Sequence, residues 1–186
     1  DALEAVVKRK IPIVPTFTFQ ANMIDYGHFV GASTYIKDLF RREIIDSAEM
    51  LRKAYDHGVP ILCGTESGFS VTPYGQWHYR EMEILMKEMG FTSLEAIRSS
   101  TSVNAFAMRL EGEIGRIEEG AFADLIIVSG DPIKDITSLG DLENIKMIMK
   151  SGEIQKFEEE MNRLSIPGWR VVSYGQILSK DLVNKK

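Results

Sequence analysis

Apolar residues recur along this chain with a helical period in some segments and as short continuous runs in others. Residues 41–57 place Ile44, Ala48, Leu51 and further apolar side chains on one helical stripe. Gly58 follows, in the position where a glycine ends a helix, and residues 59–63 then form a wholly apolar run. Such a run is typical of a strand covered on both faces. The order of helix, glycine and buried strand predicts an α/β fold with parallel strands.

The segments on either side extend this pattern. Residues 2–9 are predicted to be the end of a helix, residues 11–19 a strand that bends or ends near Pro15, and residues 22–33 a loop. Later helices are predicted over residues 79–89, 93–100 and 102–110. Thr92 and Glu95 form a capping box for the second of these helices, and Ser102 is predicted to cap the third.

The hydrophobic period changes after residue 110. Residues 125–128 are predicted to be another buried strand, and residues 145–150 alternate as a strand does. Ser151 and Gly152 can then turn the chain into a hairpin with Ile154. The pattern therefore divides the chain into an α/β part (residues 1–110), a β-rich part (residues 111–156) and a tail (residues 157–186).

Composition narrows the class of protein. The chain has 186 residues, of which 44% are hydrophobic and 26% charged, as in globular proteins that bury a core. A net charge of -5 argues against binding to nucleic acid or anionic membranes through bulk charge, and no apolar stretch is long enough to span a bilayer. The single cysteine, Cys63, fits a reducing compartment, so we expect a cytoplasmic protein. Because the chain opens with Asp1 rather than Met, we expect it to begin inside a larger protein.

The three histidines form no metal motif. His28, His57 and His78 lie too far apart for a His-x-His or a His-Glu-x-x-His pair. His57 is predicted to cap the end of a helix, where its charge meets the helix dipole favourably. For His28 a site role and a plain loop position are equally open. Cys63 lies in an apolar run and is predicted to be a core residue rather than a nucleophile.

The connection from residue 64 to residue 80 concentrates polar chemistry. It follows the carboxyl end of a predicted parallel strand, where barrels and open sheets build their sites. This connection carries more hydrogen-bonding and titratable groups than a turn needs. The residues with such groups are Thr65, Glu66, Ser67, Tyr74, Gln76, Trp77, His78 and Arg80. Composition alone leaves two interpretations, a solvated loop with Trp77 folded onto the core or a binding site.

Three segments resemble the metal-dependent amidohydrolase superfamily. Residues 59–66 (VPILCGTE) resemble its last barrel strand, and residues 93–105 (SLEAIRSSTSVNA) resemble the helices that follow. Residues 115–128 (GRIEEGAFADLIIV), with Asp131 and Pro132, resemble the strands that complete its small β-sandwich. The resemblance covers roughly residues 1 to 155 and is closest to the imidazolonepropionase-like and prolidase-like branch, whose seventh strand would be residues 11–16.

This resemblance implies a fold and a partner. The chain would carry the last two βα units of a TIM-type (β/α)8 barrel, followed by the carboxyl-terminal strands of a small β-sandwich, the composite domain. A whole barrel needs ~250 residues, more than this chain has. The family's His-x-His, bridging lysine and later metal-binding histidines have no counterpart here. We therefore expect a partner, either the missing N-terminal half or another complementary chain, and a homo-oligomer.

The resemblance also implies a chemistry, the hydrolysis of C–N bonds by water activated on one or two divalent metal ions, usually zinc. Glu66 stands where the family has an aspartate that touches the metal and moves the water's proton. Glu66 is therefore the predicted catalytic residue and metal ligand, and its extra methylene leaves direct and water-mediated contact both open. Ser67, Tyr74, Trp77 and His78 are predicted to bind the substrate.

The predicted substrate is a small amide, a dipeptide or a cyclic amide, with no role for nucleic acid or membrane. This chain alone is expected to be inactive, because most metal ligands lie outside it. The alternative function belongs to another class, a non-catalytic fragment or pseudoenzyme subunit that serves assembly or ligand binding. The absent ligands and the glutamate at position 66 favour that alternative for the chain taken alone.

Overall fold

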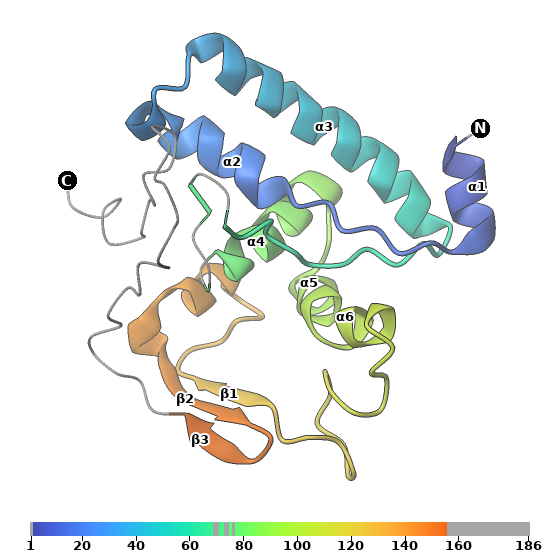
Figure 1. Ribbon diagram of the computed structural model, residues 1–186, viewed down its shortest axis with the longest axis vertical. Coiled ribbons are helices and arrows are strands. Elements are labelled where there is room, and N and C mark those ends of the chain that lie inside the picture. The colour runs from blue at the N-terminus through green and yellow to red at the C-terminus, as the bar shows by residue number, and fades with distance from the viewer. Residues whose placement is uncertain (1, 69–70, 73–74, 76, 156–186) are drawn as a thin grey trace, which may run out of the picture.

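The computed structural model describes residues 2–68, 71–72, 75 and 77–155. Helices make up most of the first 107 residues, and a small antiparallel sheet follows them (Figure 1). The predicted tail, residues 157–186, lies outside the described residues. The predicted division into three parts therefore stays a prediction.

Two extended segments of the α/β part run parallel, as predicted. Ile13 and Ile61 form a parallel bridge. The amide of Ile13 donates to the Pro60 carbonyl at 3.0 Å, and the amide of Leu62 donates to the Ile13 carbonyl at 2.9 Å. The pairing is short, because Pro15 has no N–H to continue the ladder.

The segment after Pro15 corrects two predictions. Residues 17–19, predicted as the end of a strand, begin helix α2 (Phe17–Tyr26). The predicted loop over residues 22–33 contains the rest of α2 and the 3-10 helix η1 (Gly27–Val30). Thr16 turns the chain from extended to helical in a left-handed conformation, with φ of 55°. Its side chain makes no capping hydrogen bond, so the usual local signal for a helix start is missing.

The predicted helix before Gly58 is confirmed and is longer than predicted. Helix α1 (Ala2–Arg9) precedes it, and α3 (Thr34–Asp56) starts with Ser33 as its N-cap, whose hydroxyl accepts from the amide of Ile36. His57 ends α3, and Gly58 follows with φ of 81°. The amides of Gly58 and Val59 then bond back to the last turn, to the carbonyls of Tyr55 and Ala54.

The hydrophobic core lies where α2, α3 and α4 (His78–Met89) meet the two extended segments. Helices α2 and α3 lie side by side, and α4 crosses beneath them (Figure 1). Each element contributes its apolar stripe, including Phe17 and Ala21 from α2 and Ile44 from α3. The other buried members are Ala48, Leu51, Ala54, Val59, Ile61, Ile84, Leu85, Met89 and Phe91.

The later helices confirm one predicted cap and correct another. Thr92 and Glu95 form the capping box of α5 (Ser93–Ser100), and each side chain satisfies the other's backbone amide. Helix α6 (Ser102–Ala107) has Thr101 as its N-cap, without a side-chain hydrogen bond, so Ser102 does not cap it. The helix also ends three residues earlier than predicted, because Arg109 takes a left-handed conformation with φ of 60°.

The sheet has the predicted strands and hairpin. Strands β1 (Leu125–Val128), β2 (Ile145–Lys150) and β3 (Glu153–Gln155) pair antiparallel in that order. Ser151 and Gly152 both have positive φ, 51° and 83°, which is the conformation of a two-residue type I′ turn. Between β1 and β2 lie the 3-10 helices η2 (Ile136–Gly140) and η3 (Leu142–Asn144). Ile136 of η2 is buried against Cys63, Met82 and Ala96, which docks this part on the helices.

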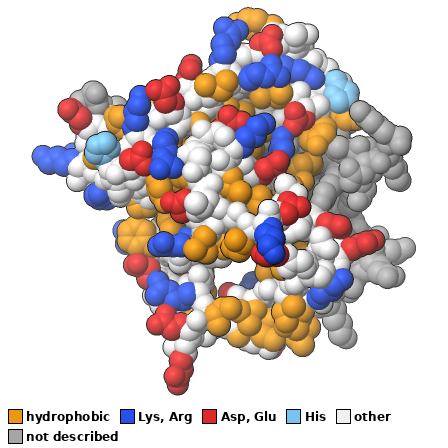
Figure 2. Space-filling model, turned by 180° about the vertical axis from the view of Figure 1, so that it is seen from behind, with side chains coloured by type: hydrophobic (Ala, Val, Ile, Leu, Met, Phe, Trp, Pro, Cys, Tyr) orange, Lys and Arg blue, Asp and Glu red, His pale blue; other side chains and the backbone are white. Residues whose placement is uncertain are grey.

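Strand β1 was predicted to be buried, and this is wrong for the chain by itself. Ile126 and Ile127 are 56% and 50% exposed. The register aligns Leu125 with Met149 and Ile154, and Ile127 with Met147, so one face of the sheet is apolar throughout. We call these five residues the apolar sheet face. Figure 2 shows apolar side chains gathered over the sheet at the lower end of the molecule. The strands thus have the apolar pattern of a protein core, but the described residues leave Ile127 and Ile154 exposed.

Candidate active site

The candidate site lies where the second extended segment leaves the parallel pair. Gly64 is packed against the first segment, because a Cβ atom added there would stand 2.5 Å from Cγ1 of Val14. Thr65 is buried, and its hydroxyl lies 2.6 Å from that of Ser67. The close approach at Gly64 therefore brings the carboxyl ends of both segments to one place.

Glu66 stands at this edge with its side chain exposed. Its backbone is left-handed, with φ of 51°, and its carbonyl accepts from the Thr72 hydroxyl at 3.3 Å. Val71 is also left-handed, with φ of 60°, although it is β-branched and fully buried. Such strained conformations persist only when the surroundings fix them, and they cluster at functional sites. Trp77, with φ of 72°, is a third.

The other predicted substrate-binding residues are placed differently. Trp77 is 3% exposed and packs between Tyr26 and Tyr79, with ring centroids 5.6 and 6.1 Å away. His78 is the first residue of α4 and is exposed, although partial desolvation lowers the pKa of its imidazole. Tyr74 lies outside the described residues. Within the described part of the chain, no hydrogen bond joins Glu66 to Trp77 or His78.

Three expectations for individual side chains can be compared with the structure. Cys63 is buried, and burial raises the pKa of its thiol to about 12, so its prediction as a core residue is confirmed. His57 caps α3, and its Nδ1 lies 2.7 Å from the Lys53 carbonyl, as predicted for a capping role. His28 lies in η1 with its ring 4.0 Å from that of Phe29, which does not decide between its two roles.

A residue that sequence reasoning missed is Glu81. It lies in the first turn of α4 and is 0% exposed. Its Oε1 accepts from the amide of Phe17 at 3.1 Å, and its Oε2 accepts from the amide and hydroxyl of Thr18 at 2.7 and 2.6 Å. Burial raises the pKa of this carboxyl to about 7, against the opposing effect of those hydrogen bonds. The only sequence signal is its position, three and four residues before the apolar Ile84 and Leu85.

Two further polar residues hold α2 near the site. Asn22 is fully buried and donates from Nδ2 to the Val71 carbonyl at 2.9 Å. Arg80 of α4 pairs with Asp25 of α2 and, at 2.7 Å, with Glu83 of its own helix. Helix α2 is therefore tied by Asn22 to the segment that precedes α4, and by Asp25 to α4 itself.

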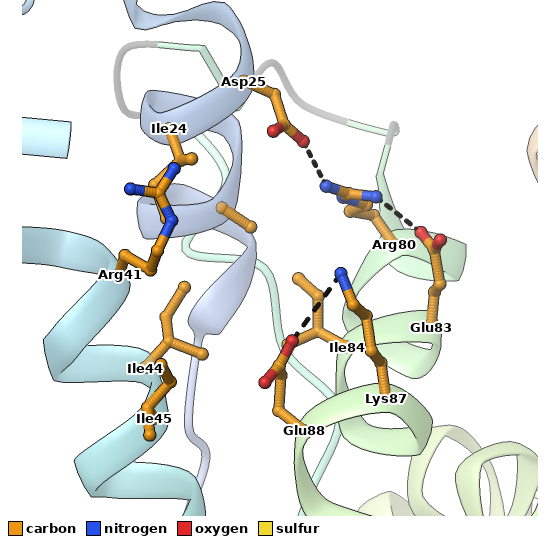
Figure 3. A pocket seen from close by; sticks show the side chains of 11 residues that line it. Ile24, Asp25, Arg41, Ile44, Ile45, Arg80, Glu83, Ile84, Lys87 and Glu88 are labelled. Carbon is orange, nitrogen blue, oxygen red and sulfur yellow. Dashed lines mark hydrogen bonds and ion pairs between the residues drawn. The ribbon is translucent and has the colours of Figure 1, made fainter. Parts of the chain in front are cut away.

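The Arg80 pairs also form one wall of a cavity of about 340 Å³ between α2, α3 and α4 (Figure 3). Its apolar lining comes from Ile24, Ile44, Ile45 and Ile84. The charged side chains around it are paired, Lys87 with Glu88 at 3.8 Å and Arg41 with Asp38 at 2.8 Å. Arg80 alone faces both Asp25 and Glu83, so the side chains around the cavity carry one negative charge in excess.

The described residues contain no group of three or more histidine, cysteine, aspartate or glutamate side chains that could hold a metal ion. Glu66 fits a metal as a single exposed carboxylate donor, with further donors needed from elsewhere. No helix in the described ranges is both long and apolar enough to cross a membrane.

Comparison with known proteins decides the family. Residues 21–155 match the model of the amidohydrolase family. The chain belongs to this family. Among solved structures, a Xaa-Pro dipeptidase with bound methionine is 31% identical with a TM-score of 0.65, over 84% of this chain and 37% of that one. An amidohydrolase is 27% identical with a TM-score of 0.65, over 85% and 37%. A prolidase complexed with N-methylphosphonate-L-proline is 24% identical with a TM-score of 0.66, over 84% and 38%.

These likenesses confirm the predicted family and its prolidase-like branch. They also indicate a TIM-barrel-type fold. The 186-residue chain spans less than two fifths of the length of each of these three proteins. No curated protein sequence matches it significantly.

Proposed function

We propose that the protein containing this chain is a metal-dependent amidohydrolase that cleaves the C–N bond of a dipeptide-like substrate. The observation that carries the proposal is the position of Glu66, an exposed carboxylate held in a strained conformation at the carboxyl end of the parallel pair. Membership of the family supports hydrolysis, and the ligands in two similar structures, methionine and a phosphonate of proline, support small amino-acid-like substrates. These similarities do not favour the non-catalytic alternative.

The proposed roles follow from exposure and position. A divalent ion, for which we propose zinc, would lower the pKa of a bound water and polarise the scissile carbonyl. Glu66 would contribute one ligand or a water-mediated contact, accept the water's proton and pass it to the leaving nitrogen. Ser67 and His78 are accessible to a substrate, whereas Trp77 would shape the pocket through its buried ring. Tyr74 completes the proposed set.

The experiment is an assay of the whole protein on a panel of Xaa-Pro dipeptides, other dipeptides and cyclic amides, with zinc added and after chelation. We expect zinc-dependent cleavage of at least one dipeptide. Cleavage that survives complete chelation would contradict the metal role. Binding of dipeptides without any cleavage would favour the non-catalytic alternative.

We also propose a complementary chain segment for the exposed surfaces of this one. The apolar sheet face and the exposed side chains of Ile11 and Val14 in the first extended segment are surfaces that a partner would cover. The missing N-terminal half would cover them, and a homo-oligomer of the complete protein is part of the same proposal. We also propose a cytoplasmic location, which a chain with a single, buried cysteine fits.

The 186-residue polypeptide alone is expected to self-associate or to melt without a cooperative transition. The physical reason is the apolar sheet face, where Ile127 and Ile154 are 50% and 63% exposed. Light scattering and a thermal unfolding scan of the purified polypeptide measure both properties. Co-expression with the complementary segment is the control and should restore a single cooperative transition. A monodisperse monomer that melts cooperatively would show that these surfaces need no partner.

The same polypeptide is expected to retain no tightly bound zinc. Three or four ligands are needed for a tight site, and the described residues gather no such group. Elemental analysis after dialysis against a weak chelator gives the stoichiometry, with the complete protein as the positive control. One zinc retained per polypeptide would instead reveal a site that includes Glu66 and the histidines.

A further inference from the structure

We propose that Glu81 is a positioning residue of the candidate active site, holding residues 16–18 against residues 64–66. This inference rests on the proposed function, because the site that Glu81 would position is the hydrolytic one.

Helix α2 begins without a side-chain hydrogen bond from its own N-cap residue. A helix leaves its first amides without partners, and a serine, threonine or aspartate at the N-cap normally accepts from them. Thr16 has a suitable side chain but makes no such bond. Glu81 of α4 takes this role instead, by accepting from the amide of Thr18, which lies 63 residues away in the sequence, and from the amide of Phe17. A negative charge at a helix N-terminus also meets the helix dipole favourably.

Capping α2 with the buried Glu81 carboxylate costs more free energy than a local cap would. Glu81 is fully buried, and a buried carboxylate loses its hydration. An exposed local cap at position 16 would have served the helix alone at much lower cost. A buried contact between distant segments does something that a local cap cannot, since it fixes where α2 begins relative to α4.

Glu81 is linked to the segment that leads to Glu66 through residues 14–18. Residues 14–16 lie against Gly64, because a Cβ atom there would stand 2.5 Å from Cγ1 of Val14 and 4.0 Å from Cγ2 of Thr16. The backbone of Glu81 donates to the Trp77 carbonyl at 3.3 Å. The Glu81 carboxylate thus holds the start of α2, and the residues just before α2 are packed on the segment that leads to Glu66.

The consequence is a specific effect on turnover. Loss of the carboxylate contact frees residues 16–18 to shift, and with them the backbone at Gly64 that orients Glu66. Displacement of a reacting group by about 1 Å typically lowers a rate by ~10²-fold. Substrate binding should change less, because Trp77 is held independently by Tyr26 and Tyr79 and by the amide of Arg80.

The test uses the complete protein with Glu81→Gln, Glu81→Asp and the control Ile84→Val. Ile84 is buried in the same helix, so its variant loosens the core without touching α2's first amides. We measure kcat and KM on the dipeptide that is cleaved fastest, at a temperature where every variant is fully folded by circular dichroism. Hydrogen exchange of the Phe17 and Thr18 amides is measured in parallel.

For Glu81→Gln we expect kcat to fall by ~10- to 100-fold with KM changed by less than about threefold. Exchange at Phe17 and Thr18 should rise by about tenfold or more, since one of their two acceptor oxygens becomes a donor. Glu81→Asp should recover part of kcat, and Ile84→Val should behave as the wild type. A kcat for Glu81→Gln equal to that of Ile84→Val, or unchanged exchange, overturns the proposal. If the wild type cleaves no substrate, the proposed function fails, and the exchange measurement alone decides whether Glu81 holds residues 16–18.

Discussion

Replacing Glu66 by glutamine is expected to lower turnover by ~10²–10⁴-fold in the protein that contains this chain, the usual loss when a general base is removed. Glutamine keeps the size and shape of the side chain but cannot accept the proton of the attacking water. Folding should change little, because the Glu66 side chain is exposed and its structural contact is made by its carbonyl, not its carboxylate. The measurement is kcat/KM on a cleaved dipeptide, with metal content determined in each preparation.

Two companion variants make this result specific. Glu119→Gln removes another exposed carboxylate of the same chain and should leave kcat unchanged. Glu66→Asp keeps a base but withdraws it by one methylene, so its activity should lie between those of the wild type and Glu66→Gln. Full activity of Glu66→Gln with normal metal content would leave Glu66 as an ordinary loop residue. Activity lost together with the metal would instead assign Glu66 mainly to metal binding.

The parts of the fold that could be predicted are those whose signals are local. Gly58 ends α3, Thr92 and Glu95 cap α5, and Ser151-Gly152 turns the hairpin, each within a few residues of the element it defines. Helix α2 was missed for the opposite reason. Its first amides are satisfied by Glu81, from α4, so no pattern near residue 16 marks its start.

Burial was harder to predict than secondary structure. The apolar run of β1 indicates a strand covered on both faces, yet Ile126 on one face and Ile127 on the other are exposed, because the described residues do not cover either side chain. An apolar pattern indicates that a residue is buried in the complete protein. In the described residues alone, an exposed apolar side chain therefore marks a surface that another segment would cover.

The candidate site shows the same division. Glu66 is proposed from its place after an apolar run and from the family resemblance, both of which are local in sequence. Asn22 and Glu81 could not be found in this way, because each acts across about 50 residues or more, on Val71 and on Thr18. Nothing in the sequence around either residue indicates burial with a distant partner.

Glu81 also predicts how the stability of the protein depends on pH. Its pKa is about 7 in the folded chain because of burial, against an ordinary value of 4.5. The folded state therefore binds this proton more tightly than the unfolded state does. The resulting stabilisation is fully present below pH 4.5 and is lost as the pH rises through 7. At ~1.4 kcal/mol per pH unit, the loss between pH 5 and pH 8 is on the order of 2–3 kcal/mol.

Urea unfolding at pH 5 and pH 8 measures the unfolding free energy of the wild type and of Glu81→Gln. The change between the two pH values is calculated for each protein, and the change in the variant is subtracted from that in the wild type. The comparison matters because other groups titrate in the same window. Burial lowers the pKa of His78, which makes the folded state less stable as the pH falls, opposite in sign to Glu81. Subtracting the glutamine variant removes that contribution, since His78 is present in both proteins. An equal pH dependence in the two proteins would mean that the folded state does not favour the protonated carboxyl, and that its hydrogen bonds to Phe17 and Thr18 fully offset its burial.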